Sequence, residues 1–213
     1  MLFRSNTRFA QFEFILNSIC TVAFASLIIL IVPFVTLYTK GVNDINYIRY
    51  VFAIVACLAE LFYCLRLAYT FMVQAKGAFR ETRNQYYIEA GLNIVISVAL
   101  VNVLGLVGIV IGTLVAMVYR TVTFAFFTYR HILKRNFINF IKRMAVTLAS
   151  IGVSSTAGYL IIRQFSIPSY WNWALYAVGA VILSTVCCAM FSLIFYRKLS
   201  VSSVKMLTGR FRR

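Results

Sequence analysis

Six long runs of apolar residues follow one another along the chain, separated by short polar stretches. They cover residues 12–38, 48–74, 84–103, 105–129, 144–162 and 170–196. Each run has about 20 residues or more, which is the length a helix needs to cross a hydrocarbon core of about 30 Å. The pattern therefore predicts an all-α polytopic transmembrane helix bundle with six spans.

The composition agrees with a membrane protein. Of the 213 residues, 62% are hydrophobic and 12% are charged, whereas a soluble domain carries about 25% charged residues. The net charge of +16 would favour a nucleic-acid partner in a soluble protein. In a membrane protein, however, the same excess marks the cytoplasmic side. We therefore expect no nucleic-acid partner and no secreted disulfide scaffold.

The distribution of Lys and Arg predicts the orientation of the spans. With the amino terminus in the cytoplasm, 16 of the 21 basic residues fall in cytoplasmic segments. Only Lys40, Arg49 and Arg163 then lie in external loops. Basic residues are concentrated on the cytoplasmic side of membrane proteins, so both termini are predicted to be cytoplasmic.

The cytoplasmic segment 130–143 mixes basic residues with Phe and Ile. We expect this segment to connect two spans as a loop. Part of it would form a short amphipathic helix that lies in the membrane–water interface. Together with the basic tail, residues 197–213, it would attract anionic membrane lipids. Alternatively, these basic residues only set the orientation of the spans and bind no particular lipid.

Four charged residues fall inside the predicted spans: Glu60, Arg66, Glu89 and Arg120. A charge at the centre of a membrane helix costs about 2.5–3.5 kcal/mol, so these side chains should face protein or a watery cavity. At about 1.5 Å per residue, Arg66, Glu89 and Arg120 share a layer roughly 8–14 Å from the inner surface. Glu60 lies close to the midplane.

The spacing of these residues predicts the faces of two helices. A polar stripe at four-residue intervals is formed by Glu89, Asn93 and Ser97. A second stripe at the same interval consists of small residues followed by a guanidinium: Gly108, Gly112, Ala116 and Arg120. Small residues let another helix approach closely, so we expect Arg120 to point into the bundle.

Two interpretations of the buried charges remain open. Arg66 or Arg120 pairs with Glu89 or Glu60 and holds helices together. Alternatively, the arginines line a cavity that receives an anionic group during transport, for which the planar guanidinium is well suited. Both interpretations hold if the Arg–Glu ion pair opens when the substrate arrives. The candidate residues of a substrate path are Arg66, Arg120, Glu60, Glu89 and Asn93.

The sequence carries no motif of an enzyme or of a bound cofactor. It has no zinc-binding His/Glu motif, no nucleophile elbow and no phosphate-cradling glycine loop. The five cysteines lie in apolar runs without metal-ligand spacing. We therefore expect no enzymatic activity, no cofactor and no metal.

Four segments carry a resemblance to a known family. They are 32–47 (VPFVTLYTKGVNDINY), 75–82 (AKGAFRET), 88–97 (IEAGLNIVIS) and 105–120 (GLVGIVIGTLVAMVYR). At these segments the sequence resembles the bacterial polysaccharide flippases for O-antigen-type, lipid-linked oligosaccharides. This family belongs to the multidrug/oligosaccharidyl-lipid/polysaccharide exporter superfamily.

The resemblance implies a transporter with two six-helix lobes around a central cavity. Such a protein flips an undecaprenyl-pyrophosphate-linked oligosaccharide across the bacterial cytoplasmic membrane by alternating access. Cavity arginines would hold the pyrophosphate, and an ion gradient or the membrane potential would drive transport. By position, Arg66, Glu89, Asn93 and Arg120 fall in motifs of the second lobe.

Members of this family are about twice as long, so the resemblance covers only their carboxy-terminal part. Residues 1–129 correspond to four helices of the second lobe, 130–143 to a basic loop, 144–196 to two further helices and 197–213 to a basic tail. An amino-terminal lobe, another copy or glycan-assembly proteins would be partners. The alternatives are a multidrug/cation antiporter that uses Glu60 and Glu89, and a membrane scaffold for glycosyltransferases.

Overall fold

The computed structural model describes residues 2–41, 48–164 and 169–210. Within these ranges the chain forms six long α-helices and a short π-helix, with no strand. The elements are α1 (Leu2–Tyr38), α2 (Tyr50–Lys76), α3 (Phe79–Leu104), α4 (Leu106–Phe127), η1 (Thr128–Ile132), α5 (Ile138–Ile162) and α6 (Tyr170–Arg210). All six α-helices contain a stretch long and apolar enough to cross a membrane, which confirms the predicted six-span bundle.

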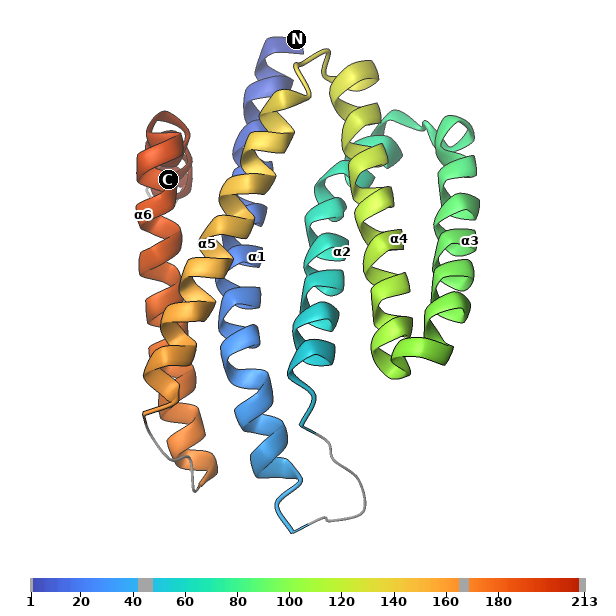
Figure 1. The fold of residues 1–213 in the computed structure, drawn as a ribbon. Helices are drawn as coiled ribbons and strands as arrows, with labels where there is room; N and C mark the ends of the chain where they lie inside the picture. The colour runs from blue at the N-terminus through green and yellow to red at the C-terminus, as the bar shows by residue number, and fades with distance from the viewer. Residues whose placement is uncertain (1, 42–47, 165–168, 211–213) are drawn as a thin grey trace.

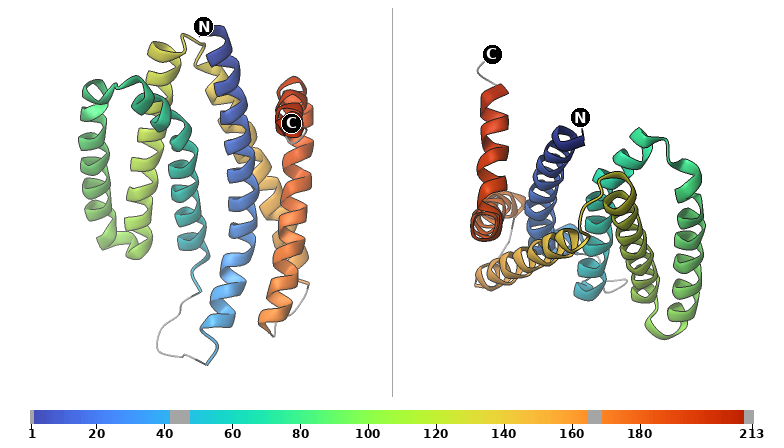
Figure 2. Two further views of the ribbon diagram at one scale, coloured as in Figure 1. Left: turned by 180° about the vertical axis from the view of Figure 1, so that it is seen from behind. Right: turned by 90° about the horizontal axis from the view of Figure 1, so that it is seen from above.

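Helix α1 is central to the bundle, because it packs against α2, α5 and α6. Helix α2 also packs against α4, and α4 packs against α3. The helices α2, α4 and α3 therefore form a row that leads away from α1 (Figures 1 and 2). Helix α5 crosses in front of α1 in Figure 1 and reaches α6 at its far end.

Glycines allow the sharp turns within this row. Helix α2 ends at Gly77, whose φ is +69° and whose amide donates to the carbonyl of Gln74 at 2.9 Å. Helices α3 and α4 are joined at Gly105, where φ is +59°. Glycine adopts positive φ without the steric cost that a side chain brings. The two turns therefore fold α3 and α4 back as a hairpin beside α2.

The small-residue face of α4 is buried against the bundle, as predicted from its spacing. Gly108, Gly112 and Ala116 are all buried. A Cβ on Gly108 would lie 2.5 Å from the carbonyl oxygen of Leu100 on α3. A Cβ on Gly112 would lie 2.8 Å from the backbone nitrogen of Ser97 and would also overlap its hydroxyl. The two backbones approach this closely only because these positions lack a side chain.

Gly112→Ala is therefore expected to push α3 away from α4 and to lower the free energy of unfolding by about 1–3 kcal/mol, as overpacking typically does. The matched control is Gly91→Ala on α3, where an added Cβ meets nothing within 4 Å. Alanine favours helix over glycine by about 1 kcal/mol, so the control should be neutral or stabilising. Unfolding in detergent micelles measures both changes. Equal effects at the two positions would contradict the close α3–α4 packing.

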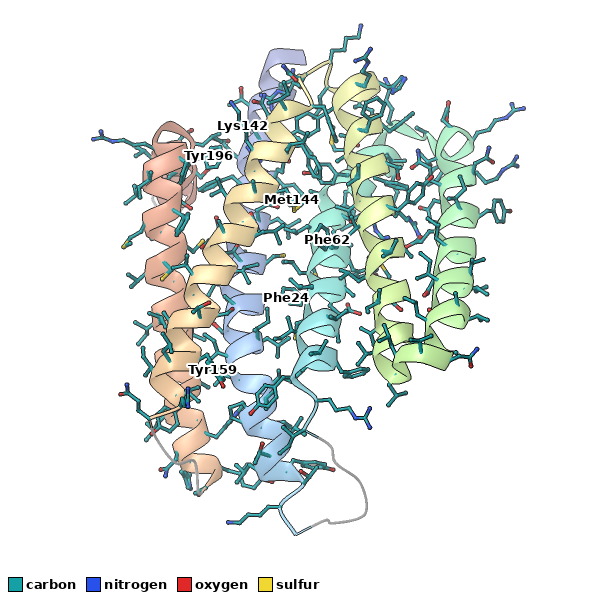
Figure 3. The ribbon with its side chains drawn as sticks, in the orientation of Figure 1. Phe24, Phe62, Lys142, Met144, Tyr159 and Tyr196 are labelled. Atoms are coloured by element: carbon teal, nitrogen blue, oxygen red, sulfur yellow. The ribbon has the colours of Figure 1, made fainter. Side chains whose placement is uncertain are left out.

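One end of the bundle carries most of the exposed basic residues, and we call it the basic end. It contains the start of α1, the α2–α3 turn and the α4–α5 connection, at the top of Figure 1. Its exposed basic residues include Arg8, Lys76, Arg80, Arg83, Arg130, Lys134 and Lys142. The opposite end exposes Lys40, Arg49 and Arg163. Figure 3 shows Lys142 near the basic end of α5 and Tyr159 towards its opposite end.

The predicted helix limits were too short at the basic end. Helix α1 begins at Leu2 rather than at residue 12, and α3 begins at Phe79 rather than at residue 84. Most of the segment 130–143, expected to be a loop with a short amphipathic helix, is helical: η1 and the first turns of α5 occupy it, and residues 133–137 connect them. Lys and Arg are good helix formers, so charged residues that end an apolar run do not end the helix.

The predicted tail, residues 197–213, is also helical as far as Arg210. At Tyr196 the backbone leaves helical geometry, with φ −134° and ψ 34°. Beyond this residue the helix turns aside from the axis of the preceding span, as the view from above shows (Figure 2, right). Residues 211–213 lie outside the described part of the chain.

Candidate functional site

Three of the five predicted site residues meet in one cluster that joins three helices. Glu89 on α3 lies between two guanidinium groups. Its Oε1 accepts a hydrogen bond of 2.9 Å from Nη1 of Arg66 on α2, and its Oε2 forms an ion pair with Nη1 of Arg120 on α4. We call this cluster the Arg–Glu–Arg triad.

The triad is buried and carries an unbalanced charge. Arg66 is 5% exposed and Glu89 is 9% exposed, whereas Arg120 is partly buried. Two guanidinium groups face one carboxylate, so the formal charge of the triad is positive by one unit. Moreover, Nε of Arg120 is buried, and it has no hydrogen-bond partner among the residues that the structure describes. Buried donors are almost always satisfied in proteins. The triad therefore has both the charge and a free donor for an additional anionic group.

Aromatic rings support the guanidinium groups. The Arg120 guanidinium carbon lies 3.5 Å from the centre of the Tyr86 ring and 5.1 Å from that of Phe124. The corresponding distance from Arg66 to Tyr63 is 4.9 Å. Cation–π contacts of this kind stabilise a charge by about 0.5–2 kcal/mol without neutralising it. The rings therefore help to hold the arginines in place while leaving the positive charge available.

The predicted polar stripe continues from the triad along the α3–α4 contact. Asn93 lies one turn from Glu89, and its Oδ1 accepts hydrogen bonds from Ser97 at 3.2 Å and from Thr113 at 3.3 Å. Asn93 thus faces α4, as Glu89 does. The predicted stripe is confirmed, and it links α3 to α4 through side-chain hydrogen bonds.

Glu60 does not belong to this cluster, because its side chain is exposed on α2. Arg66 and Glu89 each lie ten residues from the basic end of their helices, which is roughly 15 Å along the axis. They therefore lie at the same level of the bundle, as their shared layer in the sequence predicts.

Sequence reasoning missed a second buried cluster, centred on Glu13 of α1. Glu13 is 0% exposed. Its carboxylate accepts hydrogen bonds from the hydroxyls of Tyr69 on α2, at 2.5 Å, and Tyr129 in η1, at 3.0 and 3.1 Å. Arg143 of α5 completes the cluster, with its Nη1 2.6 Å from Oε2 of Glu13. One carboxylate therefore ties α1 to three other elements.

A signal for this cluster is present in the sequence. Glu13, Asn17 and Thr21 recur at four-residue intervals, in the same way as Glu89, Asn93 and Ser97. Glu13 lies one residue inside the predicted first span and was not counted among the buried charges. Arg143 was placed in a loop, although the structure buries it to 7% exposure. The stripe rule applied to the first span would have identified Glu13.

Helices α1, α2 and α5, which meet around Glu13, separate at the opposite end of the bundle. A cavity of about 650 Å³ lies between α1, α2 and α5, and its lining includes Val32, Ile54, Ser155, Tyr159 and Arg163. At the basic end the space between these helices is filled by a cluster of buried aromatic and aliphatic residues. The bundle is thus closed around Glu13 and hollow towards the opposite end.

Comparisons with family models, with curated proteins and with solved structures found no match to this chain.

Proposed function

We propose that this chain is part of a transporter of the bacterial cytoplasmic membrane that flips a lipid-linked oligosaccharide between the leaflets. In this proposal the Arg–Glu–Arg triad holds the pyrophosphate of an undecaprenyl-pyrophosphate-linked substrate. The basic end then faces the cytoplasm, together with both termini, because basic residues are concentrated on that side of membrane proteins.

The observation that carries the proposal is the unbalanced positive charge of the triad within a six-span bundle. A cluster with one carboxylate for each guanidinium would be neutral and would not need a further anion. Here Arg66 and Arg120 share Glu89, and Nε of Arg120 has no hydrogen-bond partner in the described part of the chain. Charged residues inside membrane bundles generally mark the path of a substrate or ion. An anionic headgroup would supply the missing negative charge.

The same geometry disfavours a multidrug/cation antiporter. A cation site needs a free carboxylate inside the bundle. Glu89 is engaged by two guanidinium groups, and Glu60 is exposed on the surface of α2. The buried Glu13 is engaged by Arg143 and by two tyrosine hydroxyls. The sequence motifs that resemble the polysaccharide flippases support the anionic substrate instead.

Binding of a polyprenyl pyrophosphate to the chain in nanodiscs of neutral lipid tests this proposal. We expect Arg66→Gln and Arg120→Gln each to weaken binding by roughly 10–100-fold, because a hydrogen bond to a charged group contributes about 1.5–3 kcal/mol. The matched control is Lys142→Gln, which removes one exposed positive charge from the basic end. Polyprenol without phosphate should bind weakly to every variant.

Two results would count against the proposal. If the Arg66→Gln/Arg120→Gln double variant binds the pyrophosphate lipid as well as the wild type does, the triad is not the anion site. If Lys142→Gln weakens binding as much as the triad variants do, the lipid is held at the exposed basic end, which favours the scaffold alternative.

A further inference from the structure

The cavity between α1, α2 and α5, at the end opposite the basic end, has no part in the proposed transport site. Its volume of about 650 Å³ falls within the range of roughly 300–1,000 Å³ that is usual for sites of small molecules. The atoms that line an empty space lack packing contacts, so an occupant that restores these contacts is favoured. The chemistry of the walls indicates what kind of occupant fits.

Two walls of the cavity are apolar over most of their length. Helix α1 contributes Ile28, Ile29, Val32 and Pro33, and α2 contributes Ile54. These side chains offer neither charge nor hydrogen-bonding groups to a ligand. The inner part of the cavity therefore suits a hydrocarbon chain better than a sugar or a hydrated ion.

The third wall, formed by α5, is polar. Ser155, Tyr159 and Arg163 all line the cavity, and they recur at four-residue intervals, which places them on one face of the helix. Figure 3 labels Tyr159 on this helix. The three residues extend over roughly 12 Å along the axis. Arg163 directly follows the last residue of α5, so this polar face leads from the interior of the cavity to its mouth.

The mouth of the cavity carries a positive charge. Arg163 is exposed, and among the described residues it is the one charged side chain in the lining. The connections at this end of the bundle also contain Lys40 and Arg49. Their one acidic residue is Asp44, which lies outside the described part of the chain. Basic residues thus outnumber acidic ones at this end, and the mouth favours an anionic group.

The inner part of the polar wall has an unpaired hydroxyl. Oγ of Ser155 is buried, and no residue that the structure describes forms a hydrogen bond with it. Buried polar groups are almost always paired. An occupant with a hydrogen-bond acceptor between its anionic head and its apolar chain would therefore satisfy Ser155. A phospholipid has this order of groups: a phosphate, then ester carbonyls, then hydrocarbon chains.

We propose that the cavity is a binding site for an anionic phospholipid. The phosphate binds Arg163 at the mouth, an ester carbonyl accepts a hydrogen bond from Ser155, and one acyl chain lies between the apolar walls. Arginine suits a phosphate because its planar guanidinium donates two hydrogen bonds at once. The site shares no residue with the Arg–Glu–Arg triad and lies at the end opposite the basic segments that are expected to attract anionic lipids. It is therefore independent of the proposed transport function.

Native mass spectrometry of the whole chain tests the selectivity of this site. The chain is mixed with equal amounts of phosphatidylglycerol, which is anionic, and phosphatidylcholine, which is zwitterionic, both with the same acyl chains. We expect phosphatidylglycerol to be retained preferentially. The preference should persist in the Arg66→Gln/Arg120→Gln variant, which leaves the lining of the cavity unchanged. Equal retention of the two lipids, or a preference that disappears with the triad arginines, would overturn the proposal.

Two substitutions on α5 test the contacts of the lipid head. Arg163→Gln should weaken phosphatidylglycerol binding by about 3–10-fold, because an ionic contact at an exposed mouth is partly screened by water. Ser155→Ala should weaken it by about 2–10-fold, the contribution of one neutral hydrogen bond. Unchanged affinity in either variant would overturn the proposal.

The matched control for Arg163→Gln is Lys40→Gln, which removes an exposed positive charge from the same end but not from the lining. We expect it to leave the affinity for phosphatidylglycerol almost unchanged. If Lys40→Gln weakens binding as much as Arg163→Gln does, the lipid is attracted by the general charge of this end, and the cavity site is rejected.

Filling the cavity tests where the acyl chain lies. Ile54→Trp places a large ring within the lining and should remove most of the preference for phosphatidylglycerol. Val51→Trp adds the same ring to an exposed position of α2 outside the lining and should keep the preference. Circular dichroism checks that both variants stay helical. Equal retention of phosphatidylglycerol by the two variants would show that the chain does not occupy the cavity.

A polyprenyl phosphate distinguishes a membrane phospholipid from a carrier lipid, because it has a phosphate and an apolar chain but no ester carbonyl. Its binding is measured in the Arg66→Gln/Arg120→Gln variant, so that the triad does not contribute. We expect it to bind less tightly than phosphatidylglycerol and to be insensitive to Ser155→Ala. Tighter binding of the polyprenyl phosphate than of phosphatidylglycerol would assign the cavity to a carrier lipid and reject the phospholipid.

Discussion

Replacing Glu89 with alanine is expected to lower the free energy of unfolding by about 3–5 kcal/mol, because it leaves buried charges without a counter-charge. Glu89 is the only carboxylate that contacts Arg66 and Arg120 among the described residues. It also connects α3 to α2, two helices that otherwise touch little. Titration with SDS in mixed micelles, followed by circular dichroism, measures the change.

The control for this prediction is Glu60→Ala. Glu60 lies on the exposed surface of α2 and near the midplane of the predicted span, where a charge is costly. Its loss should therefore leave the free energy of unfolding unchanged or raise it. Adding a polyprenyl pyrophosphate should restore part of the stability of Glu89→Ala if the triad accepts that anion. If Glu89→Ala, like Glu60→Ala, loses no stability, the triad does not hold these helices together.

The second large effect is expected at Glu13. Glu13→Leu should also lower the free energy of unfolding by about 3–5 kcal/mol, since it strands the buried guanidinium of Arg143. Changing both residues, in Glu13→Leu/Arg143→Met, removes the stranded charge and should recover much of this loss. An apolar pair of similar volume often replaces a buried ion pair at little cost.

The double-mutant cycle through Glu13→Leu, Arg143→Met and the double variant measures the coupling directly. Recovery should be incomplete, because the hydroxyls of Tyr69 and Tyr129 lose their acceptor and each buried unpaired donor costs about 1–3 kcal/mol. If the double variant is no more stable than Glu13→Leu, the two side chains are not energetically coupled.

Much of the fold could be predicted from the sequence. Each apolar run is long enough to cross a bilayer, and a backbone in hydrocarbon must satisfy its own hydrogen bonds, so six helices follow. The four-residue spacing of Glu89 and Asn93 placed both on one side of α3. The spacing of Gly108 and Gly112 with Arg120 placed Arg120 on the buried side of α4. These are properties of single helices, and spacing alone decides them.

The ends of the helices could not be predicted from apolar runs. Arg143 follows a stretch of basic residues and was assigned to a loop, yet the helix continues through it. A guanidinium is buried there only because Glu13, 130 positions earlier in the chain, lies against it. Whether a charge is buried depends on the residue that pairs with it. The hydropathy along the chain does not identify that residue.

The sequence by itself therefore determined the number of spans, the concentration of basic residues at one end and the buried face of each polar stripe. Only the tertiary structure decided which charges meet. In the folded bundle Glu89 contacts both Arg66 and Arg120, and Glu13 pairs with Arg143. Glu60 remains exposed on the surface. Helical periodicity is local and repeats every 3.6 residues, whereas the pairing of charges depends on how distant helices pack. That packing sets both the unbalanced charge of the triad and the neutral ion pair of Glu13 and Arg143.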